Sequence, residues 1–598
     1  MGLPRLPPPD YGSPSEAFQP GTQPTPTQVQ PSARRNCKLR KCSAGGWGGQ
    51  AGWHKRNALL SAPDDLCEEQ PCQTSSAGMH SLPPDLLIQV FSQLDPGARR
   101  LLLPLVCQQW RDVVSQPTSL WTHLDLDFAS EAFDDNGQLA QVKQEQIIAW
   151  VHQRGSAVRS LRLQGSYQPL ELREISDEDG ASSDGAVSMT ASQPLHDFTG
   201  MGLARLLLGL RLEELVLERC SDILQASAFV AIASLSNLKV LNLKGIRSQL
   251  HPSQSEALWG LGHLEELVLD CDQPQESDDA AVLPQHTADS WGLPEFPDGM
   301  LKLRNLTHLT LSCHYALTSL PSTITKLNKL QVLNLDFCTL ENLPASLGNL
   351  TALTTLDVEG NLFLGDAFRQ LPSTPPGMPP ISPLNLSGLS SLRYLNLNAC
   401  GLTQIPEMLS ELHGLETLDL EDNELGLEDG SAAVMGRSLT SLSRLQCLNV
   451  AQCRLSHLPA IVERLSGLRI LDLTNNRITN EGLPASLARL PHLKAIGLKK
   501  NRLTSVPRLL GGLRSLQELY LEDNEDLQVG EGLDFIAQLP ALRMVMMGKT
   551  QGSWNSRSLH FMTDFGLRLH TRHPARHILR ISFPGQAPDE HDDAPMLS

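Results

Sequence analysis

Long hydrophobic runs are absent from this sequence. No stretch of 18 apolar residues occurs, so we expect no membrane association through a span. The Pro-rich first 30 residues lack the apolar segment of a secretory signal peptide. Aromatic residues make up only 5% of the chain, and its 12 cysteines lie mostly singly, which does not predict a disulfide framework. We therefore expect the cytoplasm and/or nucleus as the compartment.

Basic residues are also fewer than acidic ones, 48 against 66, and the net charge is −18. Most of the excess lies in three segments: six acids and one Arg in 171–184, eight acids without Lys or Arg in 270–298, and four acids after Pro584. Such segments are usually solvated and weakly packed. This distribution argues against nucleic acid as a partner.

What the sequence does contain is a repeat, L-x-x-L-x-L-x-x-N/C, mostly at intervals of 23 to 26 residues. A degenerate copy begins at Val158. The first leucines are Leu212, Leu238, Leu264, Leu306, Leu330, Leu353, Leu392, Leu415, Leu445, Leu468, Leu493, Leu516 and Leu542. The alternating leucines predict a short strand with one buried face in each copy.

Two further positions recur with the repeat. The residue eight after the first leucine, here called the ladder position, is Asn or Cys in nine copies: Cys220, Cys338, Asn361, Cys400, Asn423, Cys453, Asn476, Asn501 and Asn524. An amide there can hydrogen-bond backbone groups, and a buried thiol can replace it. A P-x-x-L-x-x-L pattern precedes several strands, which predicts a short helical or 3₁₀ segment opened by proline.

These motifs resemble the leucine-rich-repeat family over residues 158–583. The resemblance implies an α/β solenoid, a horseshoe with a parallel concave sheet of some thirteen or fourteen strands. Out-facing residues of its strands would form an acidic, amide-rich trough followed by a basic step. We expect this concave face to hold a protein partner with a basic or amide-rich surface, although exposed strand residues must be polar in any case. The candidate residues are Asn334, Asp336, Asp357, Glu359, Asn396, Asn398, Asp419, Glu421, Asn449, Asp472, Lys499 and Tyr520.

A short helical region precedes the repeats. Apolar residues from 86 to 94 follow one helical stripe after Pro83 and Pro84, and a second helical stretch covers 106–114. The order L-P, V-F, V-C-x-x-W and L-W resembles an F-box. The resemblance implies a small three-helix domain that binds a Skp-type adaptor, and through it cullin. The adaptor-binding residues would be Leu82, Pro83, Leu86, Val90, Leu94, Val106, Trp110, Leu120 and Trp121.

Together, the two resemblances predict a non-catalytic substrate-recognition subunit of an SCF-type ubiquitin ligase, with an unknown protein as its target. Two alternatives stay open: the helices 82–121 could serve to cap the solenoid, and the chain could be a scaffold outside any ligase. No nucleophile–base pair or nucleotide-binding fingerprint is apparent, so we expect no enzyme activity, no cofactor and no metal. The spaced cysteines 37, 42, 67 and 72 lie in a Gly- and Ser-rich region, which favours a linker over a zinc site.

The expected organisation is a disordered region at 1–78, an F-box at 79–125, a helical linker at 126–157, the solenoid at 158–583 and an acidic tail at 584–598. The wider intervals between copies predict inserts near 171–200, 271–305, 362–391 and 424–444, either lids or disordered loops.

Overall fold

A computed structural model describes residues 84–93, 106, 108–115, 119–127, 141–165, 200–220, 224–246, 250, 255–271, 292–365, 386, 388–426, 438–528, 533–536, 538–547 and 578–581. Leu82, Pro83 and Leu94, the region 1–78 with its four cysteines, and the acidic tail lie outside the described residues.

One parallel sheet of sixteen strands in sequence order organises the chain. The strands are β1 (His123–Asp127), β2 (Ser160–Gln164), β3 (Glu214–Glu218), β4 (Val240–Ile246), β5 (Glu266–Cys271), β6 (His308–Thr310), β7 (Val332–Asn334), β8 (Thr355–Asp357), β9 (Tyr394–Asn396), β10 (Thr417–Asp419), β11 (Cys447–Asn449), β12 (Ile470–Asp472), β13 (Ala495–Gly497), β14 (Glu518–Tyr520), β15 (Met544–Met547) and β16 (Ile578–Ile581). This confirms the leucine-rich-repeat solenoid, with more strands than the repeat count predicted.

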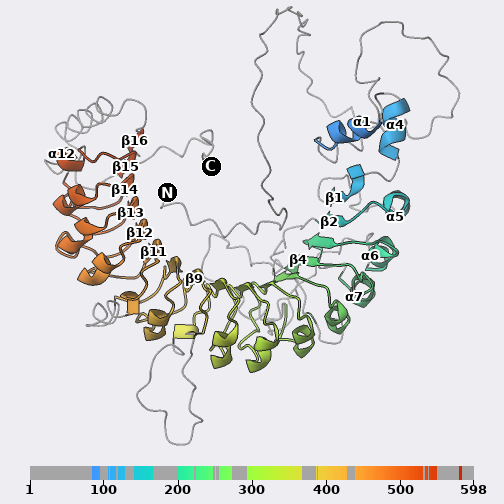
Figure 1. Cartoon of the computed structure of the whole chain (residues 1–598), viewed down its shortest axis with the longest axis horizontal. Coiled ribbons are helices and arrows are strands. Elements are labelled where there is room, and N and C mark those ends of the chain that lie inside the picture. The colour runs from blue at the N-terminus through green and yellow to red at the C-terminus, as the bar shows by residue number, and fades with distance from the viewer. Residues whose placement is uncertain are drawn as a thin grey trace, which may run out of the picture. The chain divides into compact units, whose positions relative to one another are not determined.

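Helical segments lie on the other side of the repeats from the strands (Figure 1). The α-helices are α1 (Pro84–Phe91), α4 (Gln108–Ser115), α5 (Gln141–Arg154), α6 (Gly200–Leu207), α7 (Ala226–Ala233) and α12 (Leu533–Ile536). The 3₁₀ segments are η4 (Ser119–Trp121), η6 (Glu256–Gly260), η7 (Asp298–Lys302), η8 (Ser322–Lys326), η9 (Ala345–Asn349), η10 (Glu407–Glu411), η11 (Ala460–Arg464), η12 (Ala485–Arg489) and η13 (Arg508–Gly512).

Proline opens the 3₁₀ segments, as the P-x-x-L pattern predicted. Each of the six prolines of that pattern lies directly before its segment, at 321, 344, 406, 459, 484 and 507. Pro297 does the same before η7. The pattern did not reveal this copy because Met300 takes the place of its first leucine. The fixed φ of proline suits the start of such a segment and removes a donor that would have no partner.

The sheet starts earlier than the repeat pattern indicated. Strand β1 pairs with β2 in parallel, from His123 beside Ser160 to Asp127 beside Gln164. The region assigned to a helical linker therefore contains the end of β1 and all of α5, and it belongs to the solenoid. Leu161 and Leu163 of the degenerate copy are fully buried, so this copy is a regular rung of the core.

The wider intervals do not interrupt the sheet. Strand β5 pairs with β6, β8 with β9 and β10 with β11 in continuous register, although 27 to 36 residues lie between the strands of each pair. The strands on either side of each insert are therefore neighbours in the sheet. The leucines at the fourth and sixth repeat positions, such as Leu333 and Leu335, are fully buried, so the out-facing residues are those the alternation predicted.

The turn after each strand has a recurring backbone conformation. The residue before the ladder position has a positive φ in most copies, among them Phe337, Asp422 and Lys500, with values of 51° to 53°. This left-handed conformation costs about 1 kcal/mol for a residue with a side chain. It recurs because ladder hydrogen bonds hold the turn, and Gly360 meets the same requirement without that cost.

Candidate functional site

The ladder side chains join neighbouring repeats. In the nine copies with Asn or Cys, the ladder donor reaches the carbonyl oxygen of the sixth-position residue one repeat earlier: Asn361 Nδ2 lies 2.9 Å from Leu335 O, and Cys453 Sγ lies 3.0 Å from Leu420 O. Asparagine also accepts, since Leu340 N donates to Asn361 Oδ1 at 2.9 Å. The prediction that a buried thiol can replace the ladder amide is confirmed. The thiol replaces only the donor of the amide and not its acceptor.

His314 is a ladder residue that the N/C pattern missed. It lies eight residues after Leu306 and is fully buried. Leu293 N donates to His314 Nδ1 at 3.2 Å, which leaves the proton on Nε2 to donate to Leu269 O at 2.8 Å. Burial lowers the pKa of His314 to about 4, so the ring is neutral. Counting positions instead of matching residue types would have identified it.

The helices of the F-box-like region present a small apolar surface. Leu86 and Val90 lie one turn apart on α1 and are 44% and 41% exposed, and Val106 is 49% exposed. In contrast, Leu87 and Phe91, on the adjacent face of α1, are buried. One face of α1 therefore forms the local core, while the other leaves apolar side chains in water.

Trp110 belongs to that core more than to the surface. Its ring packs edge-on against Phe91, with centroids 4.8 Å apart. Leu120 and Trp121 are only 1% and 2% exposed, so their expected place on an adaptor surface is corrected. Trp121 Nε1 donates to Val114 O at 2.8 Å, and the guanidinium of Arg154 lies 5.1 Å from its ring centroid. These residues tie α4 to α5.

The predicted trough residues lie together on the exposed side of β7 to β14, here called the sheet face. Its central column consists of Asn and Asp residues, and both residue types have the same structural role there. The side-chain oxygen of each of these residues accepts the backbone N–H two residues later, at 2.9 to 3.1 Å, which ends the strand. The column comprises Asn334, Asp357, Asn396, Asp419, Asn449 and Asp472.

The next column, one step toward the turn, is cross-linked by amides. Glu359 accepts from Asn396 Nδ2 at 3.0 Å and from Asn398 Nδ2 at 3.1 Å. Glu421 accepts from Asn449 Nδ2 at 3.0 Å and from Gln452 Nε2 at 2.8 Å. The carboxylates are thus held in place before any partner arrives, which lowers the entropy cost of binding.

Partial burial shifts the titration of these acids. It raises the pKa of Asp357 to about 7 and that of Asp419 to about 6, and repulsion from neighbouring carboxylates adds to the effect. Burial also raises the pKa of Asp336 and Asp472. The negative charge of the sheet face therefore increases with pH through the neutral range.

The sheet face extends further toward the N-terminus than predicted. Asp270 occupies in β5 the repeat position that Asp336 occupies next to β7, and burial raises its pKa to about 7. Ser312, between them, hydrogen-bonds both carboxyl groups, which opposes the rise. Asp270 was counted with the acidic segment 270–298, but its repeat position, six after Leu264, places it on the sheet face.

The expected basic step is smaller than predicted. Lys499 Nζ lies 3.6 Å from Asp523 Oδ2, which offsets its charge. Tyr520 is buried, and its hydroxyl donates to Glu518 Oε2 at 3.0 Å. Within the described residues, no group of three His, Cys, Asp or Glu side chains could hold a metal ion. None of the described helices is long and apolar enough to cross a membrane.

Comparisons with known proteins agree with both parts of this architecture. The F-box-like family matches residues 79–127, and the leucine rich repeat family matches residues 466–525. The chain therefore combines an F-box-like region with leucine rich repeats, the arrangement of the F-box/leucine-rich-repeat family. Both domains are protein-interaction modules, and the matched families indicate no enzyme class.

Individual relatives match only part of this chain. The TMV resistance protein N of Nicotiana glutinosa is 30% identical over 201 residues, 30% of this chain and 16% of that protein. Human volume-regulated anion channel subunit LRRC8A is 31% identical over 94 residues, 16% of this chain and 11% of the subunit. The chain thus spans less than a fifth of the length of these relatives.

Solved structures match this chain at low identity and low TM-score. A leucine-rich-repeat protein of Leptospira interrogans is 21% identical with a TM-score of 0.34, over 60% of this chain and 98% of that one. The TLR13–ssRNA13 complex gives 18% identity and a TM-score of 0.42, over 72% of this chain and 59% of that one.

Proposed function

We propose that this protein is the substrate-recognition subunit of an SCF-type ubiquitin ligase. In this proposal the exposed face of the F-box-like region binds a Skp-type adaptor, and through it cullin, while the sheet face binds the target. The chain itself is not catalytic. One observation supports this most directly: a region that matches the F-box-like family leaves Leu86, Val90 and Val106 exposed beside a buried core.

The energetics favour a partner on this face. Burying one such side chain removes apolar surface from water, and each square ångström contributes about 25 cal/mol. Three side chains that are already 41% to 49% exposed can therefore contribute a few kcal/mol, on the order expected for the centre of an interface. Because Leu87 and Phe91 already fill the local core, burying this face does not require the helices to rearrange.

The sheet face supplies the second interaction. Its carboxylates and amides are fixed by the hydrogen bonds of Glu359 and Glu421, so they suit a partner segment rich in Lys, Arg or amide groups. A target held there would have its lysines close to a conjugating enzyme bound elsewhere in the complex. The rate gain comes from effective concentration, which needs no catalytic group on this chain.

The test is binding of the full chain to a purified Skp-type adaptor, measured by calorimetry. Leu86→Glu/Val90→Glu places charges on the exposed face of α1 and should abolish binding without unfolding the domain. The matched control is Met201→Glu/Leu208→Glu, because Met201 in α6 and Leu208 directly after it are also apolar and exposed, at 62% and 69%. The control should bind like the wild type.

Absence of adaptor binding by the folded wild-type chain would overturn the ligase proposal. In that case the helices before β1 would act as a cap of the solenoid, and the protein would be a scaffold. Equal loss in both double variants would show that binding follows general surface hydrophobicity and not the F-box-like face.

A further inference from the structure

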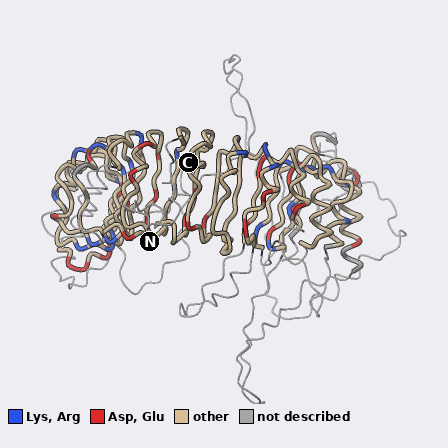
Figure 2. The backbone as a smooth tube through the Cα atoms, turned by 90° about the horizontal axis from the view of Figure 1, so that it is seen from below, with Lys and Arg blue, Asp and Glu red and all other residues tan. Residues whose placement is uncertain are grey.

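A groove of about 650 Å³ lies along the edge where the strands from β10 to β15 begin. Five exposed basic side chains line it: Arg444, Arg469, His492, Lys494 and Arg514. We call it the basic groove. Figure 2 shows charged positions along the edges of the repeats. The groove stands out because the chain as a whole carries a net charge of −18.

Few acidic side chains offset the positive charge of the basic groove. Its one acidic lining residue, Glu416, lies 3.6 Å from Arg393 and accepts from Gln446 Nε2 at 3.1 Å. Among the described residues, no carboxylate oxygen lies within 4.0 Å of Arg444, Arg469, Lys494 or Arg514. Side chains of like charge on neighbouring repeats repel each other, so the bare protein gains no stability from this arrangement.

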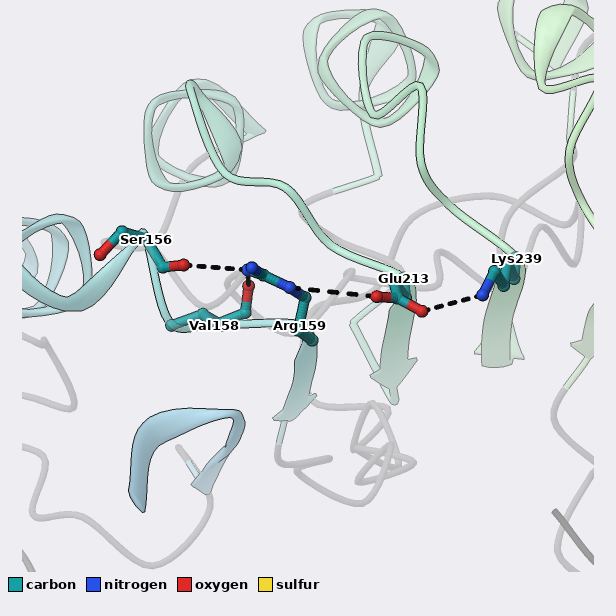
Figure 3. A network of polar contacts seen from close by, with 5 residues as sticks. All are labelled: Ser156, Val158, Arg159, Glu213 and Lys239. Carbon is teal, nitrogen blue, oxygen red and sulfur yellow. Dashed lines mark hydrogen bonds and ion pairs between the residues drawn. The ribbon is translucent and has the colours of Figure 1, made fainter. Parts of the chain in front are cut away.

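The same edge at the other end of the solenoid is neutralised. There a groove of about 590 Å³ contains Glu213, Lys239 and Glu265 at equivalent repeat positions. Glu213 lies between Arg159, at 3.9 Å, and Lys239, at 3.0 Å, as Figure 3 shows. Charges of opposite sign alternate from strand to strand here. The fold therefore does not require cations at this edge, and the basic groove needs a separate explanation.

The spacing of the cations indicates the shape of the ligand. Arg469 and Lys494 precede the adjacent strands β12 and β13, Arg444 lies before β11, and Arg514 before β14. Arg469 and Lys494 each lie one residue before their strand, so their backbones are about 4.8 Å apart. Arg444 lies three residues before β11 and Arg514 four residues before β14, so the four cations form a band about 15 Å long across four strands and not a single row. A single phosphate can contact one or two of them. An extended chain has side chains on one side about 6.6 Å apart, so a run of acidic residues is long enough to reach all four cations.

We propose that the basic groove binds an extended Asp- and Glu-rich segment of a partner protein. This surface is distinct from the sheet face: Arg469 precedes β12, whereas Asp472 ends it, so the two surfaces of opposite charge lie at opposite ends of the same strands. The inference does not depend on the ligase proposal, because adaptor binding involves only the helices before β1.

The probe is a fluorescein-labelled hexaglutamate peptide, titrated with the full chain and followed by fluorescence anisotropy. Arg469→Gln/Lys494→Gln should weaken binding about tenfold, since two charge contacts are lost. Lys239→Gln/Lys329→Gln removes two charges from the neutralised groove and should change the Kd less than about twofold. Raising NaCl from about 50 to about 300 mM should weaken wild-type binding.

Three outcomes would overturn the proposal. Equal losses in the two double variants would indicate binding to overall charge. Tighter binding of a hexaserine peptide with one phosphoserine would replace the line of acids by a phosphate site. Binding by a chain shortened after Pro584, but not by the full chain, would show that the acidic residues 585–598 occupy the groove themselves. Circular dichroism of each variant verifies that it is folded.

Discussion

Replacing Asn423 with Ala tests how the ladder stabilises the solenoid. The side chain is buried, and its Nδ2 donates to Leu397 O at 2.8 Å and to Leu420 O at 2.9 Å. Its Oδ1 accepts from Leu402 N at 2.8 Å and from Cys400 N at 3.2 Å. Nδ2 also donates to Glu421 O at 3.2 Å. Alanine removes all five bonds, and the buried backbone groups among their partners are too deep for water to replace the lost partner fully.

The expected cost follows from those groups. An unsatisfied buried donor or acceptor costs about 1–3 kcal/mol, and at least two remain here, so we expect a loss of about 2–5 kcal/mol. Asn423→Cys should cost about half as much. A thiol restores the donor, as in Cys453, whose Sγ lies 3.0 Å from Leu420 O, but it does not restore the acceptor.

Urea unfolding followed by circular dichroism measures the loss, and hydrogen exchange of the Cys400 and Leu402 amides locates it. Exchange is needed because repeat proteins can unfold in parts. The control is Asn237→Ala, an exposed amide whose loss should change stability by less than about 0.5 kcal/mol. If both variants behave alike, or if exchange at Leu402 is unchanged, the ladder does not stabilise the turn and the reasoning is wrong.

Three further predictions concern charge and burial. Burial raises the folded-state pKa of Asp357 from 3.8 to about 7, so the ionised carboxyl makes the wild type less stable as the pH rises from 3.8 to 7. Asp357→Asn lacks this titration. Its free energy of unfolding, minus that of the wild type, should therefore be larger at pH 8 than at pH 5 by at least about 1 kcal/mol, measured by urea unfolding. Glu213→Gln removes two ion pairs whose members are 40% to 51% exposed, and thermal unfolding should show a change below about 0.5 kcal/mol that vanishes in high salt. His314→Ala should lower the free energy of unfolding by about 2–4 kcal/mol, because it leaves a void and removes the donor to Leu269 O. His314→Asn should recover part of that loss, and equal urea midpoints for the two variants would contradict a ladder role.

Periodicity in the sequence predicted most of the fold, because each repeat buries the same positions. The leucines, the ladder residues and the prolines before the 3₁₀ segments lie where the pattern placed them. The misses have physical causes. Strand β1 has alternating Leu124 and Leu126 but lacks the ladder residue, and Met300 and His314 fill leucine and ladder positions with other residue types. Packing and hydrogen bonding determine what a side chain must do at a given repeat position, and more than one residue type can meet that requirement.

The candidate sites were less predictable, because a motif does not separate core from surface. The L-W pair of the F-box-like pattern proved to be interior, since the indole of Trp121 finds a backbone partner at Val114 O. Leu86 and Val90, from the same pattern, are exposed. On the sheet face, the Asn and Asp residues of the central column have a local role in ending strands, which the out-facing position alone did not reveal.

Function in this solenoid is easier to recognise across the repeats than along the chain. The residue after the first leucine alternates in charge at one end, from Arg159 to Glu213 and Lys239, and these side chains pair. At the other end the same position carries Arg469 and Lys494 without a described acidic partner. Because the repeat holds the backbone of each copy in one geometry, packing places no demand on the sign of this exposed charge. The two adjacent cations at this position therefore fit an acidic partner, and the hexaglutamate titration tests that proposal directly.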